Sequence, residues 1–291
     1  MPSKLSEFPE LQINSFNTSD DVKLTYWEAG SGEPLIFVPG WSDNGALYFH
    51  IIHILSQKYH VYVLDMRNHG LSQKVDYGNR ISRFALDVKE FREHLKLESA
   101  YFNGYSMGVS ILWSYIDSFG TDSIKKLVFV DMAPALYSPR SWSETELLQA
   151  GAVTHSGEDM LDIFTGKAPR NQLLVKSNIP DHVVNTDTPF YENVSEFNQE
   201  FIHNDVELMK KVLWENIYND WRDVITNKIN VPTLIITGEC SDWKESQYWA
   251  HSVISGSKLV VYSKEEFGDH LLMMKNPKKY TQDLTYFFSS N

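Results

Sequence analysis

Short, nearly unbroken apolar runs alternate along this chain with longer amphipathic segments, and this alternation restricts the possible folds most strongly. The apolar runs are PLIFVPG (34–40), HVYVLDM (60–66), SAYFNGYS (99–106) and KKLVFVDMAP (125–134). Such runs are typical of strands that are buried on both faces. The helical segments expected between them, from apolar residues spaced three or four apart, are 46–57, 81–97 and 108–119. Strands alternating with helices favour an α/β fold with a mostly parallel sheet.

The alternation stops after residue 136 and returns near residue 231. Between these points the helical patches SETELLQAG, SEFNQEFI and VELMKKVLWENIYNDW follow one another with little that resembles a central strand. Strand-like runs return at 231–238 and 257–263, and Pro277 opens a last helix. We therefore expect a core domain in two parts, 1–136 and 223–291, with a helical cap, 137–222, inserted over one end of the sheet.

The segment DVKLTYWEAGSG (21–32) differs from the central runs because apolar and polar residues alternate with period two. This pattern predicts an outer antiparallel strand.

Charge and cysteine content exclude several classes of function. The net charge of −12 and the pI near 5.3 argue against nucleic-acid binding, because the phosphates would be repelled. Cys240 is the only cysteine, so the chain forms no internal disulfide and no cysteine-based zinc site. The N-terminal segment lacks the apolar core of a secretory signal, and no apolar run approaches the ~20 residues that span a bilayer. We expect a cytoplasmic protein with a small-molecule substrate, no metal and no cofactor.

The stretch GYSMG (104–108) places a serine between two glycines, where a predicted strand turns into a predicted helix. A tight strand-to-helix turn strains the backbone at its centre and requires small neighbours. Gly104 and Gly108 supply that space, and Ser106 is lifted to the edge of the sheet at the N-terminus of the following helix. Five-residue patterns arise by chance, but this one occurs in the expected strand–turn–helix context, which makes it specific.

Over residues 22–288 the chain resembles the α/β-hydrolase family, in its esterase-like branch. The segments that carry the resemblance are FVPGW (37–41), LDMRNHGLS (64–72), GYSMG (104–108), LVFVDMAP (127–134), VPTLIITG (231–238) and GDHLLMMKNP (268–277). Two positions depart from the family pattern. Pro39-Gly40 replaces His-Gly after the third strand, and Asn68 replaces the first glycine of the Asp-x-Arg-Gly loop. Neither change removes a reacting group.

The resemblance implies a catalytic triad, because a serine hydroxyl needs a neighbouring base to take its proton. Ser106 is the expected nucleophile and His270, which comes last in the chain, the expected base. The acid has two candidates. The commonest family position, Gly-x-x-Asp after the seventh strand, falls on Ser241, with Asp242 one residue late; the alternative after the sixth strand is Asp131. We prefer Asp131.

The resemblance also implies an oxyanion hole built from backbone N–H groups, those of Trp41 and Met107. Each such donor is worth ~3 kcal/mol in the transition state. Tyr105 is a candidate for the substrate pocket, with ordinary core packing as an equally good interpretation.

The expected activity is hydrolysis of a carboxylic ester, thioester or lactone through an acyl-enzyme on Ser106. Alternatives on the same triad are C–C bond hydrolysis and acyl transfer, and a third alternative is a ligand-binding protein that has lost catalysis. Haloalkane dehalogenases and epoxide hydrolases of this family would need Asp at position 106. The predicted cap is rich in aromatic residues, some of which would hold its helices together and others line an apolar pocket. These are Tyr137, Trp142, Phe164, Phe190, Tyr191, Phe197, Phe201, Trp214, Tyr218 and Trp221.

Overall fold

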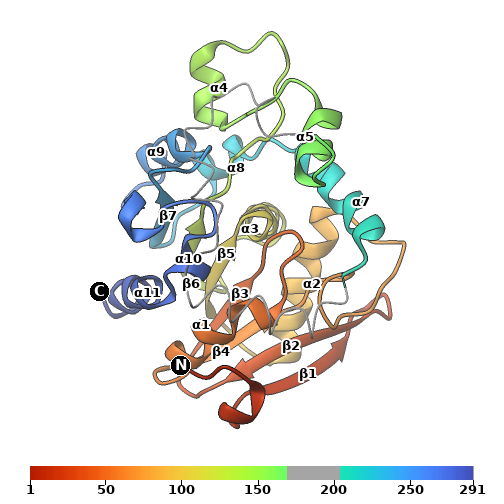
Figure 1. Ribbon diagram of the computed structural model, residues 1–291, viewed down its shortest axis with the longest axis vertical. Helices are drawn as coiled ribbons and strands as arrows, with labels where there is room; N and C mark the ends of the chain where they lie inside the picture. Colours follow the sequence, from red (N-terminus) through yellow and green to blue (C-terminus); the bar gives the residue numbers. More distant parts are fainter. Residues whose placement is uncertain (169–203, 291) are drawn as a thin grey trace.

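A computed structural model describes residues 1–168 and 204–290, and these form an eight-stranded sheet with helices on both faces (Figure 1). The strands are β1 (Gln12–Asn17), β2 (Lys23–Ala29), β3 (Glu33–Val38), β4 (Tyr59–Leu64), β5 (Ala100–Tyr105), β6 (Ile124–Val130), β7 (Thr233–Gly238) and β8 (Lys258–Tyr262). Their order in the sheet is β1-β2-β4-β3-β5-β6-β7-β8. In this order, every pair of neighbouring strands from β4 to β8 is parallel. The pairs β1–β2 and β2–β4 are antiparallel. The prediction of a mostly parallel α/β sheet is confirmed.

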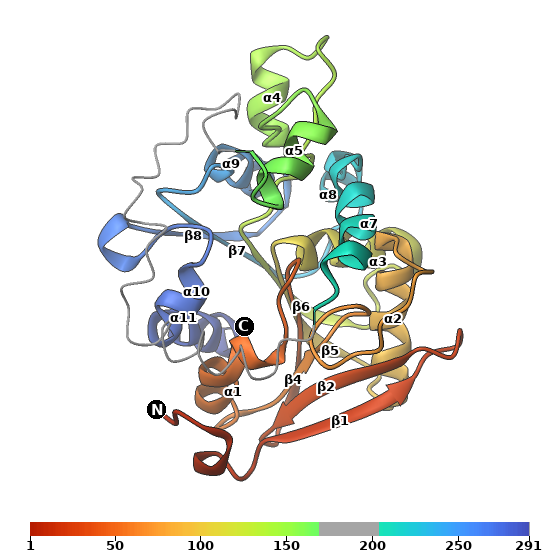
Figure 2. The same ribbon diagram turned by 45° about the vertical axis from the view of Figure 1, so that its right-hand side comes forward.

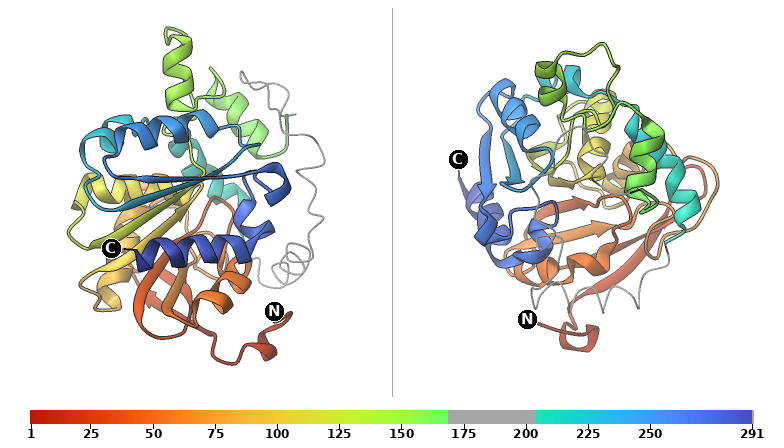
Figure 3. Two further views of the ribbon diagram at one scale, coloured as in Figure 1. Left: turned by 90° about the vertical axis from the view of Figure 1, so that its left-hand side faces the viewer. Right: turned by 45° about the horizontal axis from the view of Figure 1, so that its top comes forward.

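Two groups of helices cover the sheet (Figure 3). One face is packed by α2 (Ile81–His94), α3 (Met107–Phe119), α8 (Arg222–Asn227) and α9 (Lys244–Val253). The other face is packed by α1 (Phe49–Leu55), α10 (Leu272–Lys275) and α11 (Pro277–Ser289). Short 3₁₀ turns lie at Leu5–Glu7, Gly45–Tyr48 and Lys264–Glu266.

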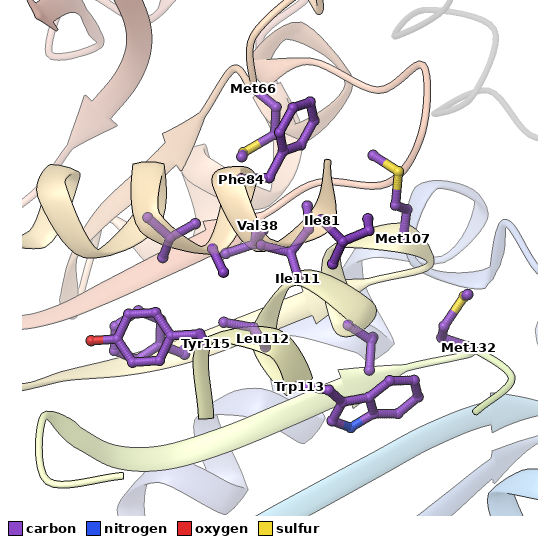
Figure 4. Close-up of a cluster of buried hydrophobic side chains, with 14 of the residues drawn as sticks. Val38, Met66, Ile81, Phe84, Met107, Ile111, Leu112, Trp113, Tyr115 and Met132 are labelled. Atoms are coloured by element: carbon purple, nitrogen blue, oxygen red, sulfur yellow. The ribbon is translucent and has the colours of Figure 1, made fainter. Parts of the chain in front are cut away.

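The central strands have no polar face because both of their faces are covered. In β3, Ile36 and Val38 pack into the core beneath α2 and α3, whereas Leu35 and Phe37 pack into the core beneath α1 and α11. Figure 4 shows Val38 beside residues of α2 and α3 in the first of these cores. Successive strand side chains point to opposite faces, so a strand covered on both sides must be apolar throughout.

The edge of the sheet differs from the prediction. β2 is antiparallel to its neighbours, as expected, but β1 lies outside it and forms the edge. β1 was missed because only Phe16 of its six residues is buried, so the strand carries no apolar run.

A helical insertion follows β6. Its described helices are α4 (Glu144–Ala150), α5 (Gly157–Phe164) and α7 (Val206–Ile217), with α8 leading back to β7. The helical patch expected at 195–202 lies outside the described residues. Figure 2 shows these helices gathered at one end of the molecule. Because the insertion starts at the carboxyl end of β6, it lies at the edge of the sheet where ligands bind in open α/β folds.

Candidate active site

Ser106 occupies a strained turn between β5 and α3. Its backbone angles are φ 52° and ψ −128°, which L-residues rarely adopt. The turn is held on both sides, because the Ser106 N–H donates to Val130 O at 3.0 Å and Val109 N–H donates to Ser106 O at 2.8 Å. Strain of about 1–3 kcal/mol persists only where the surroundings enforce it, and it concentrates at functional sites.

The two flanking glycines are required by close packing. A Cβ on Gly108 would lie 1.9 Å from Val38 O, and a Cβ on Gly104 would lie 2.8 Å from Gly108 O. Atoms of folded proteins do not approach this closely, so α3 reaches β3 and β5 only with glycine at both positions. The GYSMG turn was predicted from the sequence to require small residues on both sides of Ser106, and the structure shows these close contacts.

Ser106, His270 and Asp131 form a continuous chain of hydrogen bonds. The distance from Ser106 Oγ to His270 Nε2 is 3.0 Å, and His270 Nδ1 lies 2.7 Å from Asp131 Oδ2. An ionised carboxylate only accepts hydrogen bonds, so Nδ1 carries the proton and Nε2 is left to accept the proton of Ser106. The Asp131 side chain is fully buried, whereas that of His270 is 23% exposed, as a group that meets substrate and water must be.

Asp131, the preferred candidate acid, contacts the imidazole. It follows β6 with φ 48°, and its N–H continues the ladder to Ile236 O at 2.9 Å. Its second oxygen, Oδ1, accepts from Thr237 Oγ1 at 2.6 Å. Thr237 was not anticipated, because a threonine in the run LIITG (234–238) is also an ordinary strand residue.

Two aromatic rings hold His270 in place. Trp243 meets the imidazole edge-on, with ring centroids 4.8 Å apart and planes at 88°. The ring centre of Tyr105 lies 5.1 Å from that of His270, and the Tyr105 hydroxyl donates to His270 O at 2.8 Å. Tyr105 is only 2% exposed, so the structure places it against the histidine, and its assignment to the substrate pocket stays a prediction. Trp243 was not anticipated from the sequence.

The two expected oxyanion donors come from separate elements that meet at Ser106. Met107 is the first residue of α3, and the first amides of a helix have no partner within it. Trp41 belongs to the turn that follows β3. This turn lies against Ser106, because a Cβ on Gly40 would be 3.0 Å from Ser106 Cβ.

Asp43 brings a further carboxyl group to the same place. Its Oδ2 accepts the Gly40 N–H at 3.1 Å. The same hypothetical Cβ on Gly40 would lie 2.9 Å from Asp43 Oδ2, so this oxygen and Ser106 share one small region. Burial raises the pKa of Asp43 to about 7, against the opposing effects of the Gly40 N–H and of the nearby His270. No motif pointed to Asp43, which the sequence shows only as a polar loop residue.

Three described aromatic residues of the insertion, Tyr137, Trp214 and Tyr218, form one cluster, and Trp142 contacts a cation. Tyr218 packs against Tyr137 at 5.1 Å and against Trp214 at 4.9 Å, and the guanidinium of Arg222 lies 4.2 Å from the ring centre of Trp142. These contacts join the end of α7 and the start of α8 to the segment that precedes α4, so these aromatic residues serve packing within the insertion. Trp221 packs against the core, and its main-chain N–H donates to Pro134 O at 3.0 Å. The remaining candidates, Phe190, Tyr191, Phe197, Phe201 and the side chain of Phe164, lie outside the described part.

Within residues 1–168 and 204–290, no three histidine, cysteine, aspartate or glutamate side chains converge on a possible metal position. Over the same residues, no helix has the length and apolar character needed to cross a membrane.

Comparison with known proteins agrees with this architecture. A non-heme haloperoxidase from Rhodococcus erythropolis is 29% identical over 121 residues, which cover 40% of this chain and 43% of that protein. A putative non-heme chloroperoxidase from Synechocystis sp. is 24% identical over 255 residues, 79% of this chain and 82% of that protein. An esterase from Exiguobacterium antarcticum superimposes with a TM-score of 0.75 at 20% identity, covering 95% of this chain and 99% of the esterase.

Residues 33–272 match the family described as the alpha/beta hydrolase fold, and this range includes every member of the Ser106–His270–Asp131 chain. The chain belongs to the α/β-hydrolase fold family.

Proposed function

We propose that the protein is a serine hydrolase that cleaves a carboxylic ester, thioester or lactone through an acyl-enzyme on Ser106. One observation carries the proposal. A serine in a strained strand-to-helix turn lies 3.0 Å from His270 Nε2, and a fully buried carboxylate holds the opposite nitrogen of the same ring. A serine, a base and an orienting acid in this order are what acyl transfer requires.

In the proposed reaction, Ser106 Oγ attacks the carbonyl carbon while His270 Nε2 takes the hydroxyl proton. The Asp131 carboxylate stabilises the imidazolium that forms. The carbonyl oxygen becomes negative, and the backbone N–H groups of Trp41 and Met107 are the proposed donors to it. The tetrahedral intermediate collapses, the leaving group departs with the proton from His270, and Ser106 keeps the acyl group. Water activated by His270 then releases the acid.

The helical insertion is proposed as a cap, residues 137–222, between core segments 1–136 and 223–291. Its start at the carboxyl end of β6 and its hydrogen bonds to the turn at Trp41 and Ser42 support this division. An apolar acyl group is the expected ligand of the space between cap and core. The cytoplasmic location remains a prediction from the sequence.

The proposal is tested with p-nitrophenyl esters of increasing acyl length and with a fluorophosphonate that labels reactive serines. Wild type and Ser106→Ala are compared, with Ser110→Ala as the matched control, because Ser110 is a fully buried serine in the next turn of α3. Turnover and labelling are expected to vanish only in Ser106→Ala.

Labelling without turnover would favour C–C bond hydrolysis or acyl transfer on the same residues. Absence of both in folded wild-type protein would overturn the hydrolase assignment and favour a ligand-binding protein.

A further inference from the structure

The turn that carries one proposed oxyanion donor is bonded directly to the helical insertion. The indole Nε1–H of Trp41 donates to the main-chain oxygen of Met209 at 3.0 Å. Met209 is fully buried in α7, so this acceptor has a fixed position. A residue whose backbone belongs to the candidate site therefore has its side chain anchored in the insertion, 168 positions later in the chain.

Asn204 provides a second connection, from the segment that leads into α7. Its Nδ2 donates to Ser42 O at 2.6 Å, and its Oδ1 accepts the Gly70 N–H at 2.7 Å. The next residue, Asp205, donates its N–H to Asn68 O at 3.2 Å and caps α7 by accepting from Leu208 N at 3.0 Å. The start of α7 is thus attached to two loops of the core, and Asn204 joins both.

The turn itself has a conformation that needs support. Ser42 has φ 67°, in the left-handed region that favours glycine. The turn closes through Asp43 N–H to Gly40 O at 3.3 Å and Gly40 N–H to Asp43 Oδ2 at 3.1 Å. Internal bonds act at the two ends of the turn, whereas the bonds from the insertion hold its middle residues, Trp41 and Ser42.

We propose that the Trp41 indole and the Asn204 amide are positioning residues that couple α7 to the oxyanion turn. With both bonds in place, the insertion holds the Trp41 main-chain N–H in the direction of the developing oxyanion. This inference rests on the proposed function. Substrate contacts with the insertion would then be expressed in kcat rather than in KM, because they strengthen an interaction made only in the transition state.

The test uses Trp41→Phe, which keeps an aromatic ring but removes the N–H donor, and Asn204→Ala. The matched control is Trp214→Phe, which removes the indole of a tryptophan on α7 that is 37% exposed and packs against Tyr218. For p-nitrophenyl butyrate we expect each test variant to lose about tenfold in kcat, the effect of one neutral hydrogen bond, with KM changed less than about twofold.

Two inhibitors separate positioning from general damage to the structure. A trifluoromethyl ketone forms a tetrahedral oxyanion on the serine, whereas butyrate resembles the product. Trp41→Phe is expected to lower the affinity for the ketone by the same factor by which it lowers kcat/KM. Butyrate binding is expected to stay unchanged. The variant that combines Trp41→Phe and Asn204→Ala should lose less kcat than the product of the two single losses, because both bonds act on one turn. A rise in KM with unchanged kcat would overturn the coupling and leave Trp41 as a pocket wall.

Hydrogen exchange tests the coupling independently of any activity. The Asp43 amide, bonded to Gly40 O, should exchange about tenfold faster in Asn204→Ala than in Trp214→Phe. Unchanged exchange at this amide would overturn the coupling even in an active enzyme. Faster exchange in a protein that neither hydrolyses esters nor reacts with fluorophosphonate would support the coupling and overturn the proposed function instead.

Discussion

Replacing Asp131 by asparagine removes a negative charge from the candidate site with almost no change in shape. The carboxylate is fully buried, lies 2.7 Å from His270 Nδ1 and accepts a second bond from Thr237 at 2.6 Å. Asparagine fits the same space. It either presents its oxygen to Nδ1, without charge, or presents its amide N–H and forces the histidine proton onto Nε2, where it blocks transfer from Ser106.

The size of the effect follows from the geometry. Opposite unit charges 2.7 Å apart attract by about 6 kcal/mol at an effective dielectric constant of ~20. A loss of ~10⁴-fold in kcat, as for the same exchange in a serine protease triad, corresponds to about 5.5 kcal/mol. The two energies agree, so we expect Asp131→Asn to lower kcat about 10⁴-fold.

The assay is steady-state hydrolysis of p-nitrophenyl acetate, with circular dichroism and urea unfolding to confirm the fold. Asp242→Asn is the matched control, because it makes the same exchange at the other candidate acid. It should retain wild-type kcat within about threefold. An Asp131→Asn enzyme within tenfold of wild type, or equal losses in both variants, would refute the assignment of Asp131 as the acid.

Three further predictions concern neighbouring residues. Burial raises the pKa of Asp43 to about 7, so the stability that its protonated form contributes is complete below the ordinary value of 3.8 and is lost as the pH rises through about 7. As the pH rises from 4 to 8, Asp43→Asn should therefore gain stability relative to wild type in urea unfolding. A difference in free energy of unfolding that does not change with pH would contradict the burial of a protonated Asp43. Thr237→Val should lower kcat about tenfold by leaving Asp131 Oδ1 without its donor, whereas Thr237→Ser should restore it in the same ester assay. Gly108→Ala should destabilise the fold by about 3 kcal/mol in urea unfolding, because its Cβ would overlap Val38 O; a loss under about 1 kcal/mol would contradict the close approach of α3.

Much of the core was predictable because burial on both faces leaves a strong local signal. The strands β3 to β7 are nearly continuous apolar runs, and the helices α2 and α3 carry apolar residues at helical spacing. β1 was not predictable in this way, since an edge strand with one buried residue resembles a loop.

Ser106, His270 and Asp131 could be singled out from the sequence because each has a recognisable flank: Ser106 and Asp131 directly follow strands, and His270 lies in the loop between the last strand and the last helices. The supporting residues could not, because their roles come from contacts between distant segments. Thr237 meets Asp131 across 106 positions, and Asn204 meets Ser42 across 162. Neither carries a motif, and an aspartate in a polar loop, such as Asp43, gives no sign that the fold will bring it next to Ser106.

The central claim is that Ser106 becomes acylated during turnover. The most direct measurement is mass spectrometry of wild type and Ser106→Ala after brief reaction with p-nitrophenyl acetate, followed by peptide mapping. We predict one acetyl group on the peptide that contains Ser106, formed rapidly in wild type and absent from Ser106→Ala. Ester hydrolysis with no acetyl group on this peptide, or with the acetyl group on another residue, would contradict the account.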